Sequence, residues 1–148
     1  MPGRNKESAE CTAPEVAIER AERGSYVLIL LLPFARRIQV GSLGVIHFPK
    51  GVYLYMGSAL GGLDARISRH ARREKKLFWH IDYFLRHAQI LDVWVCPDGR
   101  RRECQWTRAA LALPNARVPA PRFGSSDCRC PSHLVHLAPK RARKGKPS

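Results

Sequence analysis

Runs of apolar residues separated by glycine, proline and charged residues predict a series of short β-strands. The strongest run is Tyr26–Leu32, which is rich in β-forming residues and is ended by Pro33, as is typical of a buried strand. Two shorter runs next to it, interrupted by glycine, favour a hairpin, and three later runs favour further strands. These five runs are Ile38–Val40, Gly44–Phe48, Val52–Met56, Ile90–Val95 and Leu134–Ala138. We expect the last of them to be a short edge strand.

Elsewhere the apolar residues recur every three or four positions, which predicts helices. The first helix begins at Leu63 and continues through Ile67. A second is predicted over Phe78–His87 and a third over Glu103–Leu113, which Pro114 ends. The resulting order of strands and helices predicts an α+β fold, with helices packed on a small, mostly antiparallel sheet.

The chain of 148 residues has room for one domain. Residues 1–23 are predicted to form a polar arm and a short helix, residues 24–138 the folded domain, and residues 139–148 a disordered basic tail. No apolar run approaches the ~20 residues of a membrane-spanning helix, and no secretory signal is recognisable. We therefore expect a cytoplasmic protein, nucleoid-associated if bacterial, with no membrane partner.

The net charge of +14 at pH 7 points to a polyanionic partner. The segment 24–139 holds 17 basic and 7 acidic side chains, and the last nine residues hold 5 basic and none acidic, so the excess is not confined to the tail. Because binding to phosphates releases counterions, nucleic acid is the leading candidate partner.

The stretch 51–70 holds the residues best suited to chemistry. A strand delivers Tyr55 and then Gly57, where the missing side chain lets the backbone approach a ligand. After a glycine-containing turn, Arg66 and His70 lie four residues apart on one face of the predicted helix. Arginine binds phosphate oxygens, and tyrosine or histidine can move a proton, so the group suits a phosphodiester. The alternative is that Tyr55 belongs to the core and that Arg66 and His70 form a solvated face.

Two short motifs precede this helix and several polar motifs follow it. The motifs are Gly24-Ser-Tyr26, Tyr55-Met-Gly57, Trp79–Tyr83, Glu103-Cys104, Phe123–Cys130 and Ser132–Leu134. In this order the set resembles the GIY-YIG nuclease superfamily, in particular its branch of small uncharacterised domains that are sometimes fused to endonuclease III-type proteins. The resemblance covers about residues 24–137. Gly51-Val-Tyr53 is a second candidate for the first motif.

The resemblance implies a three-stranded core sheet with an inserted hairpin and flanking helices, and metal-dependent cleavage of DNA. Tyr26 and Tyr55 would be the motif tyrosines, one of which helps to activate the attacking water. Arg66 would bind the phosphate, and His70 would carry a proton or bind phosphate. Glu103 would be the single metal-binding glutamate, for Mg²⁺ or Mn²⁺. The prediction is a metal-dependent DNA endonuclease, and the alternative is a noncatalytic nucleic-acid-binding module on the same fold.

Several residues around these motifs are candidates for nucleic-acid contact. Basic side chains in the helix and the loop after it would track phosphates without reading sequence. With the glycine and serine of the second motif, the candidates are Gly57, Ser58, Arg69, Arg72, Arg73, Lys75 and Lys76. Four more polar residues in the later motifs would face the substrate: His80, Asp82, Asp127 and His133. For His80 and Asp82, the alternative is that they satisfy local polar groups.

A zinc site is considered at the segment that contains Cys128, Cys130, His133 and His136. Structural zinc sites draw on two separated ligand pairs, the first of them spaced Cys-x₂₋₄-Cys, whereas this pair is spaced Cys-x-Cys. Zinc is therefore disfavoured, and the segment is interpreted as a rigid, turn-rich loop whose thiols pack inside.

Overall fold

The computed structural model describes residues 22–126 and 128–139. The predicted N-terminal arm and nearly all of its helix, together with Asp127 and the basic tail from residue 140, lie outside the described residues. No helix in these described ranges is long and apolar enough to cross a membrane.

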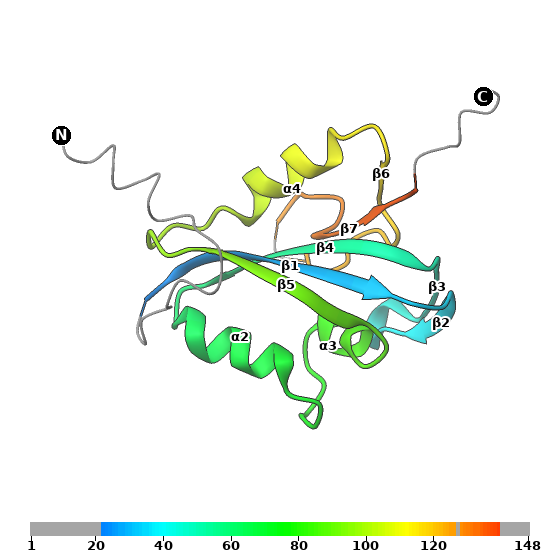
Figure 1. Cartoon of the computed structure of the whole chain (residues 1–148), viewed down its shortest axis with the longest axis horizontal. Helices are drawn as coiled ribbons and strands as arrows, with labels where there is room; N and C mark the ends of the chain where they lie inside the picture. Colours follow the sequence, from blue (N-terminus) through cyan, green and yellow to red (C-terminus); the bar gives the residue numbers. More distant parts are fainter. Residues whose placement is uncertain (1–21, 127, 140–148) are drawn as a thin grey trace.

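The centre of the fold is an antiparallel sheet, which contains five strands within the described ranges (Figure 1). Their order across the sheet is β5-β1-β4-β7-β6. The strands are β1 (Gly24–Leu32), β4 (Gly51–Ala59), β5 (Gln89–Cys96), β6 (Ala116–Arg117) and β7 (Leu134–Leu137). The predicted α+β class with an antiparallel sheet is confirmed. The sheet is wider than the expected three strands, because β7 pairs with β4 and β6 pairs with β7, so β7 is not at the edge.

The predicted hairpin is present between β1 and β4. It consists of β2 (Arg36–Gln39) and β3 (Val45–Phe48), joined by a short 3₁₀ turn over Gly41–Leu43. The two strands form a separate antiparallel sheet. Phe48 is fully buried in the main core, so the hairpin is packed against the domain rather than extended from it.

Helices cover both faces of the sheet (Figure 1). Helices α2 (Leu63–Ala71) and α3 (His80–Leu85) lie on one face, and α4 (Glu103–Leu111) lies on the other. Alternate residues of β1, such as Leu28 and Leu30, are fully buried in the larger core. This period of two is typical of a strand that packs one face on a core. Because β4 is central, its C-terminal end lies beside the starts of helices from both faces.

Gly57 lies inside β4, which continues to Ala59 rather than ending at Met56 as predicted, and the glycine-containing turn follows at residues 60–62. It pairs across the sheet with Tyr26 of β1. A Cβ atom at Gly57 would lie 2.5 Å from both the Cζ and Oη atoms of Tyr26. The glycine therefore makes room for the Tyr26 ring, which lies across the backbone of β4.

We expect Gly57→Ala to destabilise the protein by about 1–3 kcal/mol, since the added methyl group overpacks a buried site and displaces Tyr26. Gly61→Ala is the matched control, because a Cβ atom there would meet nothing within 4 Å. Urea unfolding of both variants measures the difference. Equal stability of the two variants would contradict the close contact between Gly57 and Tyr26.

Candidate active site

A cavity of about 490 Å³ lies beside the C-terminal half of β4. It is lined by residues from β1, β4, α2, the starts of α3 and α4, and the loop before β7. Four of the five residues expected to be catalytic share it, namely Tyr26, Tyr55, Arg66 and Glu103. The other predicted residues that line it are Gly57, Ser58, His80 and His133. Residues more than seventy positions apart in sequence are thus brought to one place.

Arg66 is the cation on the α2 side of the cavity. Its Nη1 atom donates to the backbone oxygen of Ser58 at 3.0 Å, and its Cζ atom lies 4.5 Å from the centre of the Trp79 ring. A guanidinium held by a carbonyl and an aromatic face has few rotamers left, so it is positioned before a ligand arrives. The arrangement suits a phosphate oxygen in the cavity.

Glu103 stands at the first position of α4, opposite the strand end. Its carboxylate accepts a hydrogen bond from the Ser58 hydroxyl and lies 3.8 Å from Nε of Arg101, whose side chain is 61% exposed. The Ser25 side chain holds the backbone of the loop before α4 in place. Its Oγ accepts a hydrogen bond from the N–H of Arg102 at 2.7 Å and donates one to the carbonyl of Arg100 at 2.9 Å. Among the described residues that line the cavity, Glu103 provides the carboxylate.

Tyr26, which lines the cavity, forms a buried pair with His70, which lies outside the lining. The Tyr26 hydroxyl lies 2.7 Å from His70 Nε2. Burial raises the pKa of Tyr26 to about 12, although the nearby Arg66 charge opposes this rise. Burial, followed by the charge of Lys75, lowers the pKa of His70 to about 3. At neutral pH both groups are uncharged, and His70, outside the cavity lining, is placed to position Tyr26 rather than to carry a proton or bind phosphate.

The low pKa of His70 predicts a pH-dependent stability. Below about pH 6.5 the unfolded chain binds a proton at this residue and the folded protein does not, so stability falls as pH falls, by about 1.4 kcal/mol per pH unit. Between pH 7 and pH 5 the wild type should lose about 2 kcal/mol more than His70→Gln. Urea unfolding at both pH values measures this loss, and His47→Gln on the exposed face of β3 is the control. Parallel losses in wild type and His70→Gln would contradict the assignment.

Tyr55 lines the same cavity, and burial raises its pKa as well. Its ring packs against Gly124, where a Cβ atom would lie 3.2 Å from Tyr55 Cε1 and where φ is +71°. The loop therefore needs glycine both for its backbone conformation and for the tyrosine. The hydroxyls of Tyr26 and Tyr55 are both candidates to hold a water molecule in the cavity.

His80 and Asp82 have different surroundings although they are two residues apart. His80 lines the cavity, and its Nδ1 accepts a hydrogen bond from the N–H of Gly124 at 2.9 Å. The proton of the neutral ring is therefore on Nε2, which makes that atom a donor. Asp82 is fully buried outside the cavity and accepts two bonds from Arg69, at 2.8 and 3.0 Å. Of the two residues predicted to face the substrate, His80 therefore lines the cavity, whereas Asp82 is buried outside it and binds Arg69.

The predicted phosphate-binding cations also divide into two groups. Arg69 is engaged by Asp82 and lies with its Cζ atom 4.3 Å from the Trp79 ring centre. Lys75 donates to the backbone oxygens of Arg69 and His70 at the end of α2, and burial lowers its pKa. The remaining three are exposed and lie outside the cavity: Arg72, Arg73 and Lys76. These three remain candidates for contact with a phosphate backbone.

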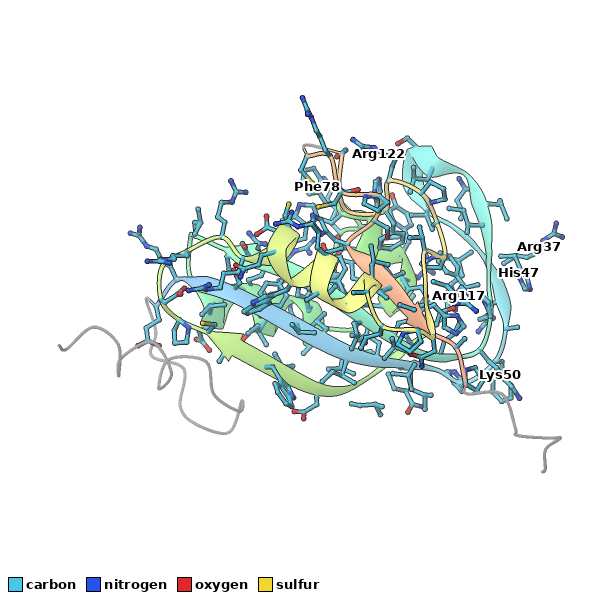
Figure 2. The ribbon with its side chains drawn as sticks, turned by 90° about the horizontal axis from the view of Figure 1, so that it is seen from above. Arg37, His47, Lys50, Phe78, Arg117 and Arg122 are labelled. Atoms are coloured by element: carbon cyan, nitrogen blue, oxygen red, sulfur yellow. The ribbon has the colours of Figure 1, made fainter. Side chains whose placement is uncertain are left out.

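Six cavity residues were not predicted as site residues from the sequence: Met56, Phe78, Trp79, Arg101, Gly124 and Ser126. Phe78 is 73% exposed although it lines the cavity, so its ring faces solvent at the opening. Ser126 lines the cavity from the loop before β7. The adjacent aromatic residues Phe78 and Trp79 were a signal, because an exposed aromatic beside a basic helix is suited to stacking on a base. Figure 2 shows Phe78 and Arg122 on one side of the molecule.

Three cysteines and one histidine gather behind the cavity wall. The Sγ atoms of Cys104, Cys128 and Cys130 and a ring nitrogen of His133 all lie within 4.8 Å of one another. Cys104 comes from α4, and its position in this group was not predicted from the sequence. His136 has other contacts, because its Nε2 lies 3.3 Å from the backbone oxygen of Lys50.

Comparison with known proteins gives a family match without a named function. Residues 25–146 match the family described as "Domain of unknown function DUF123". No curated protein and no solved structure matches the chain.

Proposed function

We propose that this chain, which belongs to the DUF123 family, is a metal-dependent endonuclease of the GIY-YIG type that hydrolyses a phosphodiester bond in DNA. One observation carries the proposal: Tyr26, Tyr55, Arg66 and Glu103 line a single cavity. A hydroxyl group, a fixed guanidinium and a carboxylate in one site are the groups that such a hydrolysis requires.

In this proposal, positively charged and hydrogen-bonding side chains bind the phosphates of the DNA. Arg66 donates to a non-bridging oxygen of the scissile phosphate, and the Nε2–H of His80, which follows the Trp79 that packs on Arg66, supplies a second donor. Phe78, exposed at the opening, stacks on a neighbouring base. The exposed Arg72 and Arg73 add sequence-independent affinity for the phosphate backbone.

The residues of the cavity fit a hard divalent cation such as Mg²⁺ or Mn²⁺. Glu103 supplies one carboxylate, and such ions retain several waters and complete their shell with substrate oxygens. The Arg101 contact at 3.8 Å does not prevent this, because its long exposed side chain can leave. When bound, the cation neutralises phosphate charge and lowers the pKa of coordinated water. Ser58 keeps the Glu103 carboxylate oriented through its hydroxyl hydrogen bond.

Tyr26 is the better of the two tyrosines for positioning the attacking water. Its hydroxyl is fixed by His70 on one side, and the Arg66 charge lowers its pKa relative to burial alone. A hydroxyl held in this way accepts a hydrogen bond from a water molecule and orients it for attack on phosphorus, and the proton of that water is released to solvent. Arg66 then stabilises the charge that develops on the phosphate oxygens.

The test is to incubate the purified chain with labelled branched, nicked and single-stranded DNA in Mg²⁺, in Mn²⁺ and in EDTA. We expect cleavage of at least one substrate with either metal and none in EDTA. Salt-sensitive binding that persists in EDTA, without product under any condition, would instead support the noncatalytic binding module. The absence of both binding and cleavage would contradict both.

A further inference from the structure

We propose that Cys104, Cys128, Cys130 and His133 bind one Zn²⁺ ion in a closed tetrahedral site. Three thiols and an imidazole within 4.8 Å of one another are a recognised zinc-ligand set. Zn–S bonds of about 2.3 Å and a Zn–N bond of about 2.0 Å require an S···N separation of about 3.5 Å in a tetrahedron. The distances from His133 Nε2 to Cys128 Sγ and Cys104 Sγ are 3.3 and 3.9 Å, on either side of that value.

The hydrogen bonds of His133 independently favour metal binding. Thr107 Oγ1 donates its single proton to the backbone oxygen of Glu103 at 2.7 Å. The contact of 2.8 Å between Thr107 Oγ1 and His133 Nδ1 must therefore use the proton of Nδ1. The lone pair is left on Nε2, the atom that faces the sulfurs. A hydroxyl that fixes the tautomer in this way is the outer partner that metal-binding histidines usually have.

The ligand set favours zinc and a structural role. Thiolate ligands select zinc, copper(I) or iron over the hard Mg²⁺ ion, and four protein ligands leave no open position for a substrate. The site would thus differ in chemistry from Glu103, which provides oxygen to a hard cation. The sequence disfavoured zinc because Cys128 and Cys130 lacked a second pair with the usual spacing. The fold adds Cys104 to Cys128, Cys130 and His133, and His136 is not part of the cluster.

The ion would fix one wall of the cavity. Cys104 follows Glu103 directly, and Cys128 and Cys130 belong to the loop that also carries Gly124 and Ser126. Zinc would therefore join the first turn of α4 to that loop and hold the Glu103 side of the cavity against the His80 side. The metal assignment does not depend on the nuclease proposal, since it is tested by metal content alone.

The test is to express the full chain in zinc-supplemented medium, purify it without chelator and measure bound metals by mass spectrometry. We expect about one zinc per chain in the wild type and less than about 0.1 in Cys104→Ala and in His133→Ala. His136→Ala, a neighbouring buried histidine outside the cluster, should keep its zinc. His133→Cys should also keep it, because a fourth thiolate completes the site.

A second measurement uses the wild type only, so that misfolding of a variant cannot decide the result. Titration with a mercurial that reacts with thiols should release one zinc per chain, detected with a chromogenic zinc chelator. Cobalt(II) in place of zinc should give the intense visible bands of tetrahedral thiolate coordination. Three results would overturn the proposal. The wild type could hold no zinc after refolding in excess zinc, it could hold iron instead of zinc, or His133→Ala could retain its zinc.

Discussion

Arg66→Ala should lower kcat/KM for DNA cleavage by about 10²–10³-fold, the loss found when one preorganised donor to a developing oxyanion is removed. Arg66 is fixed by the Ser58 carbonyl and the Trp79 ring, so no neighbouring cation is equally well placed to take over its role. Single-turnover cleavage of labelled DNA at saturating protein separates this loss from weaker binding.

Arg66→Lys and Arg73→Ala are the informative comparisons. Lysine keeps the charge but loses the planar guanidinium that lies against Trp79, so we expect only partial recovery. Arg73 is exposed outside the cavity, and Arg73→Ala should reduce binding and its salt dependence while leaving single-turnover cleavage at saturation nearly unchanged. Equal cleavage by wild type and Arg66→Ala would exclude the proposed role of Arg66.

Asp82→Ala should destabilise the fold by about 3–5 kcal/mol, the loss that follows when one partner of a buried ion pair is removed. The carboxylate is fully buried, binds both terminal nitrogens of Arg69, and accepts the N–H groups of Phe78 and Trp79 at 2.8 Å each. Its removal leaves these donors without their partner and frees the segment that carries Trp79. Urea unfolding at pH 7 gives the difference in free energy.

Glu74→Ala is the matched control, because it removes the same charge from an exposed position in the preceding loop and should change stability by less than about 0.5 kcal/mol. Burial raises the pKa of Asp82, but the Arg69 hydrogen bonds and the two backbone N–H groups outweigh it and lower the pKa overall. The stabilisation by Asp82 is therefore present at neutral pH and is lost as pH falls through the lowered pKa. If Asp82→Ala lowers the free energy of unfolding by no more than Glu74→Ala does, the result contradicts the buried ion pair.

The elements of the fold were predictable where one local pattern determined them. The uninterrupted apolar run ended by Pro33 predicted β1, and α4 begins at Glu103 as predicted. The width of the sheet was not predictable, because β6 has only two residues and its pairing with β7 depends on contacts between distant segments. The packing of Tyr26 over Gly57 was not predictable, since a glycine in a sequence does not reveal which side chain occupies the space above it.

The sequence predicted which residues form the candidate site better than it predicted the role of each residue. The motif residues Tyr26, Arg66 and Glu103 meet in one cavity, as the resemblance implied. The alternative that Asp82 satisfies local polar groups is confirmed, since it accepts the N–H groups of Phe78 and Trp79. Its pairing with Arg69 could not be predicted, because Arg69 lies on another helix and was expected to bind phosphate.

The cysteine cluster shows the same limit of sequence reasoning. The sequence placed His136 among the possible ligands of a disfavoured zinc site, and His136 contacts the backbone of Lys50. Cys104 is separated from Cys128 by 24 positions, and only the packing of α4 against the loop before β7 joins them.

Cleavage of labelled DNA in Mg²⁺ by wild type and by Glu103→Gln is the most direct test of the cavity as a hydrolytic site. Glutamine keeps an oxygen for the Ser58 hydroxyl but removes the charge that binds the cation. The account predicts cleavage by wild type that EDTA abolishes, and a rate at least ~10²-fold lower in Glu103→Gln with DNA binding intact. Cleavage that resists EDTA, or that proceeds equally fast in Glu103→Gln, would contradict it.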